Sequence, residues 1–332
     1  MLIDRRESVG GTGGFSGLTT LCGLYSDTGN FLNRCFARDF ASALSDSKPV
    51  QMGRVWVLPY RPARFRELAS RLIAAEPNLQ TRWNTTLADV VVENRRIVSL
   101  NGLGVRAVID CSGFAEVARA TGAECLATDE TTQAPAVIFP LRNVTRPLDS
   151  TAAVAQVLLP LVRAGFPPLT FHPGSEPGEI TVKFTGQPAQ VPRVIAFLQG
   201  NVAGFEHCLT PLTEFAVAHR AGRMIVGKHL LTGAEVLAGQ KFPDAVARCA
   251  WPVEQWSADG VVRFRYLAPG AHYEIPARSL QSATIENLFM AGKTISAEPD
   301  AIASARVMGC CLATGEAAGQ LAVDFLDSAR NR

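Results

Sequence analysis

The chain has 332 residues, of which 47% are hydrophobic and 19% charged, with a formal net charge of +2 and a pI near 8.1. These values are typical of a globular protein with a sizeable core, and the weak, dispersed charge argues against a nucleic-acid or membrane-surface partner. No apolar run approaches the roughly 18 residues of a membrane span, and the N-terminus lacks the pattern of a secretory signal. We therefore expect a cytoplasmic location and no membrane partner.

The first quarter of the chain predicts a strand end, a glycine-rich loop, a second strand and a helix. Residues 1–4 are typical of the end of a parallel strand closed by Asp4, and residues 10–17 predict a loop. A strand and corner follow over residues 51–61. Residues 62–75 carry apolar side chains at helical spacing, which predicts an amphipathic helix that ends before a proline.

The middle of the chain predicts a hairpin and then a strand–turn–helix unit. Residues 83–92 and 95–99 alternate in hydrophobicity around a polar turn. A buried strand over residues 105–110 runs into Cys111-Ser112-Gly113 and then a helix. From about residue 126 to 256 prolines become frequent and hydrophobic runs shorten. We interpret this stretch as a separate substrate-side region that is part sheet and part helix.

The C-terminal stretch predicts a buried strand, a tight turn and a helix with small residues on one face. The strand covers residues 287–291, and Gly292 lets the backbone turn close to a ligand where a Cβ would intrude. Gly315 and Gly319 lie about one helical turn apart. This small face fits either a cofactor or ordinary helix–strand packing. The strand–turn–helix unit ending at Gly113 likewise fits a ligand turn or a plain structural turn.

Cysteine and histidine spacing predicts no metal site. The chain has 8 cysteines without any Cys-x-x-Cys pair, and its 5 histidines show no metal-ligand spacing. Cys310 and Cys311 point about 100° apart on a helix, which favours a structural role over a redox one.

In their order along the chain, these motifs closely resemble the FAD-dependent oxidoreductase family related to the glutathione-reductase-type flavoproteins. The resemblance spans residues 1 to about 325 and implies an α/β fold: a discontinuous glutathione-reductase-like, Rossmann-type FAD-binding domain with an α+β substrate-side region. We expect the FAD-binding domain to comprise residues 1–14, 55–125 and 261–332. The substrate or cap region would comprise residues 15–54 and 126–260.

The resemblance implies FAD as cofactor and a set of residues that contact it. Asp4 would hold the adenosine ribose, and the strand–turn unit of Asp110 and Gly113 would lie near the dinucleotide. The implied cofactor-binding residues are Asp4, Gly10, Gly11, Asp110, Gly113, Gly292, Arg306, Met308 and Gly315. Of these, Gly292, Arg306, Met308 and Gly315 would lie near the ribitol and ring.

Substrate contact is less defined. Arg220, Arg223 and Glu254 are the candidates, because arginines can clamp a carboxylate bidentately, although such residues are more often surface ion-pair partners. Family members often carry an aspartate and, two residues on, a histidine where this chain has Glu254 and Trp256. The predicted function is oxidation or reduction of an unidentified small molecule through the flavin.

One family element is expected before residue 1. The glycine-rich loop is not a Gly-x-Gly-x-x-Gly, because Ser16 occupies the last required position, and the first strand and helix of the dinucleotide fold are missing. Three explanations stay open: the true start lies upstream, a complementing chain supplies the unit, or this is a relative that no longer binds flavin. The alternative function is thus a non-catalytic subunit or binding module without its own FAD. A homo-oligomer also stays open.

Overall fold

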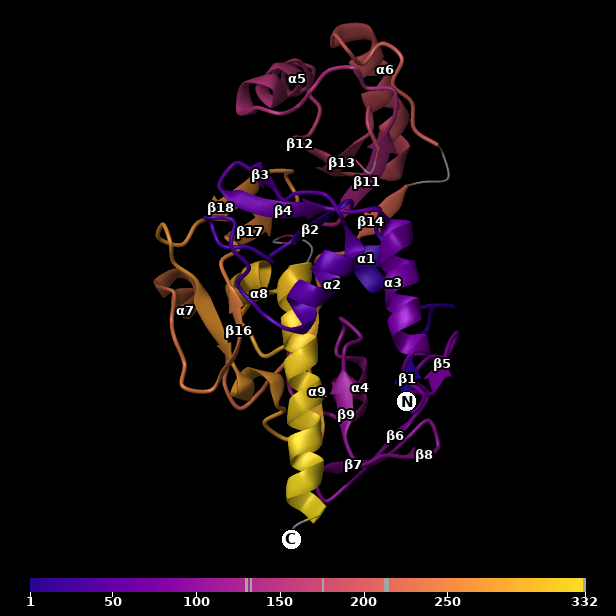
Figure 1. Cartoon of the computed structure of the whole chain (residues 1–332), viewed down its shortest axis with the longest axis vertical. Helices are drawn as coiled ribbons and strands as arrows, with labels where there is room; N and C mark the ends of the chain where they lie inside the picture. The colour runs from indigo at the N-terminus through magenta and orange to yellow at the C-terminus, as the bar shows by residue number, and fades with distance from the viewer. Residues whose placement is uncertain (129–130, 132, 175, 212–214, 331–332) are drawn as a thin grey trace.

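The computed structural model describes residues 1–128, 131, 133–174, 176–211 and 215–330. Figure 1 shows an elongated molecule in which the long helix α9 (Met308–Arg330) runs lengthwise. An antiparallel sheet with two helices forms one end, and short strands from the first third of the chain lie toward the other. Within the described residues, no helix is both long and apolar enough to cross a membrane.

Two parallel strand pairs join segments that lie far apart in the sequence. Strand β1 (Leu2–Ile3) pairs with β5 (Thr81–Arg82), and β9 (Val108–Asp110) pairs with β20 (Leu288–Met290). The strand ends predicted at Asp4 and Asp110 are therefore confirmed, and so is the mixed α/β class. Among the described residues, neither β1 nor β9 pairs with a second strand on its other side.

The glycine-rich segment forms a short helix, α1 (Gly11–Phe15), where a loop was predicted. It packs on α3 (Pro62–Ala74), which confirms the predicted amphipathic helix. Gly13 allows this contact, because a Cβ there would lie 2.5 Å from the ring of Phe65.

A three-stranded sheet in the order β2-β4-β3 and helix α2 complete this part of the fold. Their bounds are β2 Thr20–Cys22, α2 Phe36–Leu44, β3 Val50–Met52 and β4 Val55–Pro59. Since β3 pairs with β4, the expected domain boundary after residue 54 falls inside a hairpin.

The predicted hairpin and the strand–turn–helix unit are both present. The hairpin strands β6, β7 and β8 form one antiparallel sheet, and α4 follows β9. The bounds are β6 Val90–Glu93, β7 Arg96–Leu100, β8 Leu103–Gly104 and α4 Glu116–Ala120. The buried side chain of Asn287 ties the hairpin to the parallel pair through Ile97 N, Ile97 O and Arg106 O, at 2.8, 2.8 and 3.1 Å.

The substrate-side region is built on a four-stranded antiparallel sheet in the order β12-β13-β11-β14. Helices α5 (Thr151–Arg163) and α6 (Val191–Asn201) lie beside it in Figure 1 and share its apolar core. The strands are β11 Ala136–Leu141, β12 Leu169–Pro173, β13 Ile180–Thr185 and β14 Ala216–Ala218. A second short ladder joins β10 (Cys125–Ala127) to β15 (Arg223–Ile225).

The C-terminal third returns to the first part of the fold and supplies its largest core. Antiparallel pairs β16–β19 and β17–β18 pack against α8 and α9. The bounds are α7 Gly233–Ala238, β16 Ala245–Cys249, β17 Val253–Trp256, β18 Val262–Arg265, β19 Tyr273–Pro276 and α8 Pro299–Ala305. The expected domain boundary after residue 260 thus falls between the paired strands β17 and β18.

Candidate functional site

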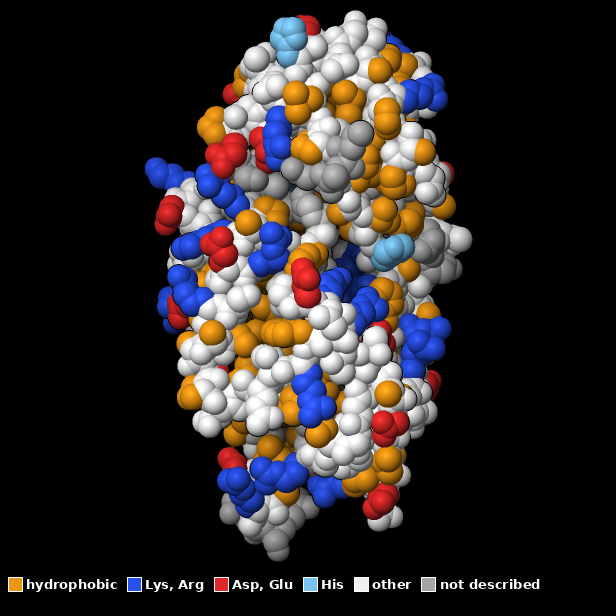
Figure 2. All heavy atoms as spheres, turned by 90° about the vertical axis from the view of Figure 1, so that its right-hand side faces the viewer, with side chains coloured by type: hydrophobic (Ala, Val, Ile, Leu, Met, Phe, Trp, Pro, Cys, Tyr) orange, Lys and Arg blue, Asp and Glu red, His pale blue; other side chains and the backbone are white. Residues whose placement is uncertain are grey.

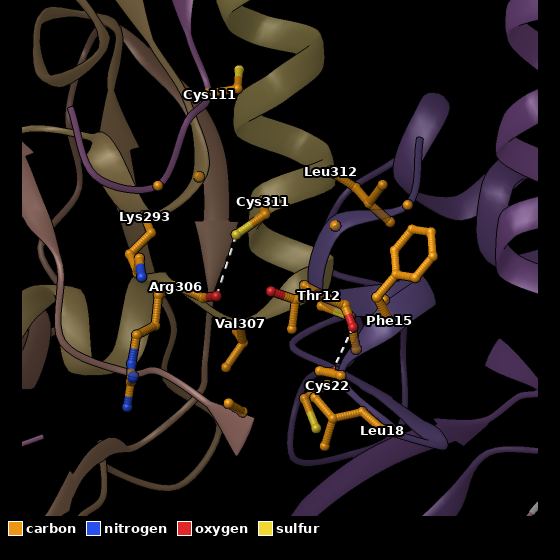
Figure 3. Close-up of a pocket in the computed structure, with 18 of the residues that line it drawn as sticks. Thr12, Phe15, Leu18, Cys22, Cys111, Lys293, Arg306, Val307, Cys311 and Leu312 are labelled. Carbon is orange, nitrogen blue, oxygen red and sulfur yellow. Dashed lines mark hydrogen bonds between the residues drawn. The ribbon is translucent and has the colours of Figure 1, made fainter. Parts of the chain in front are cut away.

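A cavity of about 2430 Å³ runs between the N-terminal and C-terminal segments and reaches the antiparallel sheet. Its volume exceeds the roughly 300–1,000 Å³ of a typical small-molecule pocket, so it has room for a large ligand. In Figure 3, Thr12, Phe15 and Cys22 form one wall, and Lys293, Arg306 and Cys311 face them from the other. Figure 2 shows basic and apolar side chains around a hollow at mid-height of the molecule.

All nine residues predicted to bind the cofactor lie on the lining of this one cavity. They come from the end of β1, the α1 segment, the end of β9 and its turn, the turn after β20, the end of α8 and the first half of α9. Residues more than 300 positions apart are brought together because α9 packs against both β2 and β9. The lining includes Asp4, Gly10, Gly11, Asp110, Gly113, Gly292, Arg306, Met308 and Gly315.

Several of these glycines leave space that a side chain would fill. A Cβ added at Gly11 or Gly315 would meet nothing within 4 Å, so both face open cavity. Gly11, Gly113 and Gly292 have φ values of +47°, +75° and +68°, a region that L side chains rarely adopt. The cavity wall is therefore bare backbone at these points, which suits close approach by an extended ligand.

The carboxylate of Asp110 holds the turn rather than facing the cavity. It is only 1% exposed and accepts hydrogen bonds from the Ser112 N–H and hydroxyl and from the backbone N–H groups of Val117 and Ala118. The Asp110 side chain is thus saturated inside the protein and braces the turn that carries Gly113, and a contact between Asp110 and the cofactor stays a prediction.

The inner end of the cavity, toward the antiparallel sheet, carries a cluster of buried charges. We call this set the inner charge cluster, and it comprises Lys183, Arg220, Glu254 and Arg306. Lys183 Nζ lies 3.9 Å from Glu254 Oε1. Arg306 donates to Gln133 Oε1 at 2.7 Å and to the backbone oxygen of Arg220 at 3.3 Å.

Two tryptophans anchor the cluster. Glu254 accepts from Trp256 Nε1 at 2.6 Å and from Trp251 Nε1 at 2.9 Å, one bond to each carboxylate oxygen. The ring of Trp256 also lies against two cations, with its centroid 3.9 Å from Arg220 Cζ and 4.4 Å from Lys183 Nζ. This packing fixes charged side chains that are otherwise flexible.

Burial and mutual charge set the protonation states in this cluster. Burial alone would raise the pKa of Glu254, but the charges of Lys183 and Arg306 outweigh it and hold that pKa at about 2. Burial lowers the pKa of Arg220 to about 9, against the opposing effect of Glu254. Burial likewise lowers the pKa of Lys183, and Glu254 counteracts it. Glu254 is therefore ionised near neutral pH and compensates the cations around it.

A neutral histidine completes the inner end. Burial, followed by the nearby charge of Lys183, lowers the pKa of His172 to about 3. Its Nδ1 lies 3.4 Å from Thr20 Oγ1, whereas its buried Nε2 has no hydrogen-bond partner among the described residues. His172 and Lys183 were not predicted as site residues. The one available signal was a lysine inside an otherwise apolar strand, between Val182 and Phe184.

Of the three residues predicted to contact substrate, the structure brings two to the cavity. Arg220 and Glu254 line it, but Arg223 does not. Arg223 lies exposed on β15, whose next residue, Met224, is buried. Met224 and Ile225, which follow it on β15, are both buried, so the exposed part of this strand is its first residue, Arg223. The prediction for Arg223 is not supported.

The fold and site define a mixed α/β protein with a glycine-lined cavity that ends in a buried charge cluster. The family model described as FAD dependent oxidoreductase matches residues 1–168 and 170–331. The chain therefore belongs to the FAD-dependent oxidoreductase family, whose cofactor is FAD. No curated protein matches the chain in sequence.

Several solved structures share a distant likeness with this chain. Halogenase PltM is 12% identical with a TM-score of 0.41, over 85% of this chain and 49% of the halogenase. A geranylgeranyl bacteriochlorophyll reductase-like protein from Thermoplasma acidophilum is 11% identical with a TM-score of 0.44, over 100% and 77% of the two chains. The aromatic hydroxylase CabE is 11% identical with a TM-score of 0.47, over 98% and 57%. The chain thus spans about half the length of the first of these.

Proposed function

We propose that this chain is an FAD-dependent oxidoreductase of the glutathione-reductase-like type that acts on a small molecule in the described cavity. One observation carries the proposal: nine residues singled out at separate positions, from Asp4 to Gly315, line a single cavity. That cavity ends in the inner charge cluster, so a cofactor region and a region for a polar reactant adjoin.

The residues present suit FAD chemically. Bare backbone at Gly11, Gly113 and Gly315 admits an extended dinucleotide, and Asp4 offers a carboxylate of the kind that accepts from ribose hydroxyls. When bound, FAD supplies an isoalloxazine that exchanges two electrons with a substrate.

Two cations give the C-terminal wall a positive charge. Lys293 Nζ donates to the backbone oxygen of Ala221 at 3.0 Å and lies 4.2 Å from the ring centroid of Phe114, while burial lowers its pKa to about 8. Arg306 stands on the same wall (Figure 3). We expect both to favour anionic groups on a bound ligand and to hold them in place.

The test is a titration of the purified protein with FAD, followed by absorbance at about 370 and 450 nm and by flavin fluorescence. The variant Gly315→Leu places a side chain in open cavity and should weaken FAD binding at least about tenfold, since it occupies the ligand's volume. Gly319→Leu is the matched control, because that glycine also has nothing within 4 Å, lies on the same helix and does not line the cavity.

The outcomes separate the proposal from its alternative. Binding that Gly315→Leu weakens and Gly319→Leu leaves unchanged supports a flavin site in this cavity. A folded wild-type protein that takes up no FAD even in millimolar excess would favour the non-catalytic binding module. FAD binding that ignores the Gly315 substitution would place the flavin elsewhere and overturn the proposed site.

A further inference from the structure

The ammonium of Lys183 is buried without a full set of partners. Its side chain is 13% exposed, and the nearest carboxylate oxygen, on Glu254, lies at 3.9 Å, beyond hydrogen-bond distance. Within the described part of the chain its Nζ makes no hydrogen bond, and its other close neighbour is the ring of Trp256. An ammonium has three donors, and a buried charge without hydrogen bonds is costly. Because Lys183 lines the cavity, a ligand there can accept from it.

The charge around Lys183 is out of balance. Among the described residues, the charged groups near it are Arg220, Arg306 and Glu254, and burial raises the pKa of the nearby Cys22 thiol to about 12. With His172 neutral, Arg220 and Arg306 alone outnumber the one carboxylate that the described residues place there, and Lys183 adds a further positive charge when it is protonated. Both oxygens of that carboxylate already accept from Trp251 and Trp256. The inner charge cluster therefore has a surplus of positive charge that an anionic ligand can neutralise.

The surroundings of the cations indicate the kind of anion. Arg220 Cζ lies 3.9 Å from the ring centroid of Trp256, and its Nη1 donates to the backbone oxygen of Ala134, so the guanidinium is held in one place with donors left for a carboxylate. Apolar lining from Ile138, Phe171 and Val217 adjoins this end of the cavity. A ligand with a carboxylate and a hydrocarbon body fits both features.

We propose that the inner end of the cavity binds the carboxylate of a small organic acid between Lys183 and Arg220, with the unpartnered Nε2 of His172 beside it. If the proposed function holds, the substrate of the oxidoreductase is such an acid. The binding site itself does not require FAD, so it can be tested separately from the flavin.

The experiment compares matched acid and amide pairs by ligand-observed NMR titration on the full chain without added FAD. Acetate with acetamide, and phenylacetate with phenylacetamide, differ in charge but hardly in shape. We expect the acids to bind and the amides to bind at least about tenfold more weakly, because a charge-assisted contact is lost. The variants Lys183→Met and Arg220→Gln should each weaken acid binding about tenfold to a hundredfold.

The controls keep the outcome decisive. Arg223→Gln removes an exposed arginine outside the cavity and should leave acid binding unchanged. Lys183→Arg keeps the charge and should retain most of the binding if Lys183→Met fails to fold. The preference for acid over amide in the wild-type protein needs no variant at all.

Three results would overturn the inference: equal binding of acid and amide, acid binding that neither cluster variant weakens, or inorganic phosphate binding much more tightly than either acid. Running the acid and amide titrations alongside the FAD titration separates the proposed carboxylate site from the proposed flavoenzyme function. Acid binding without any FAD binding rejects the flavoenzyme and keeps the anion site. FAD binding without acid preference rejects only the substrate class.

Discussion

Glu254 is the sole acid of the inner charge cluster, and its neutralisation is the sharpest test of how the cluster is held together. Glu254→Gln keeps the side-chain size but removes the charge that faces Lys183, Arg220 and Arg306. It also replaces one carboxylate oxygen with an amide NH₂ opposite an indole N–H, either that of Trp256 or that of Trp251. Two donors then face each other in a buried site, and the three basic side chains lose the one carboxylate that the described residues place beside them.

The magnitude follows from the pKa of Glu254. That pKa is about 2 in the folded protein, against an ordinary value of 4.5. At about 1.4 kcal/mol per pH unit, the difference corresponds to about 3 kcal/mol of stabilisation. Solvent screening is small because the side chain is 13% exposed. Breaking a buried ion pair by removing one partner typically costs ~3–5 kcal/mol, so the two estimates agree. We expect Glu254→Gln to lower the free energy of unfolding by about that amount.

The pH dependence has a definite sign. A carboxyl whose pKa is lowered by folding contributes its full stabilisation above the unfolded-state pKa and loses it as pH falls toward the folded-state pKa. The stability gap between wild type and Glu254→Gln should therefore be constant from neutral pH down to about pH 5 and shrink between about pH 5 and pH 2. Urea unfolding followed by circular dichroism at several pH values measures it.

Two further variants make this measurement specific. Glu286→Gln is the control, because Glu286 pairs with Arg96 at 3.4 Å with its side chain 49% exposed, and such pairs contribute below about 1 kcal/mol. The double variant Lys183→Met with Glu254→Gln removes one charge of each sign and should lose less stability than the two single losses added together. A loss below about 1 kcal/mol for Glu254→Gln, or a gap that does not change with pH, would refute the reasoning.

Three other changes test the packing outside the cluster. Gly309→Ala places a Cβ 2.6 Å from the backbone of Gly23, so we expect thermal unfolding to show a loss of about 1–3 kcal/mol in the free energy of unfolding. Gly319→Ala is the control: a Cβ there meets nothing within 4 Å, so this variant should be as stable as the wild type or more stable. Equal effects of the two substitutions would contradict the close contact at Gly309. Asn287→Ala leaves buried backbone groups of the hairpin unpaired, so urea unfolding should show a loss of about 2–3 kcal/mol in the free energy of unfolding. A loss under about 1 kcal/mol would contradict this structural role of Asn287. Cys35 and Cys111 are both exposed, but desolvation and then the charge of Asp110 raise the pKa of the Cys111 thiol to about 11, so a thiol reagent at neutral pH should modify Cys35 first. Cys35→Ala should remove the fast phase of the reaction, and persistence of that phase would assign it to another thiol.

Local sequence patterns predicted the elements that depend on local chemistry. The helix expected over residues 62–75 is present as Pro62–Ala74, because its apolar spacing and the following proline act within one helix. The strands before Asp110 and Gly292 are present because continuous apolar runs are typical of buried parallel strands. These motifs are also the ones that carried the resemblance to the family.

The remainder depended on long-range contacts that no local pattern encodes. The glycine-rich segment was predicted as a loop, but Gly13 and Gly14 pack so closely on Phe65 and Arg66 that the segment closes into α1. Arg223 was predicted to contact substrate, but its orientation depends on the pairing of β15 with β10. His172 and Lys183 could not be selected because only the pairing of β12 with β13 brings them to the cavity.

The contrast between local patterns and long-range contacts also separates the proposed cofactor region of the cavity from its proposed substrate region. The proposed cofactor side of the cavity is made of turns and a face of α9 where glycines expose backbone, so single residues such as Gly113 and Gly315 indicate its chemistry. The substrate side is made of strand side chains that meet only in the folded sheet, and its chemistry lies in the balance of charge among Lys183, Arg220 and Glu254. A relative that kept the turns but changed one of these charges would keep the cofactor and bind a different substrate. Under the two proposals, substrate specificity is therefore expected to depend on β13 and β17, and FAD binding is expected to depend on the turns after β9 and β20.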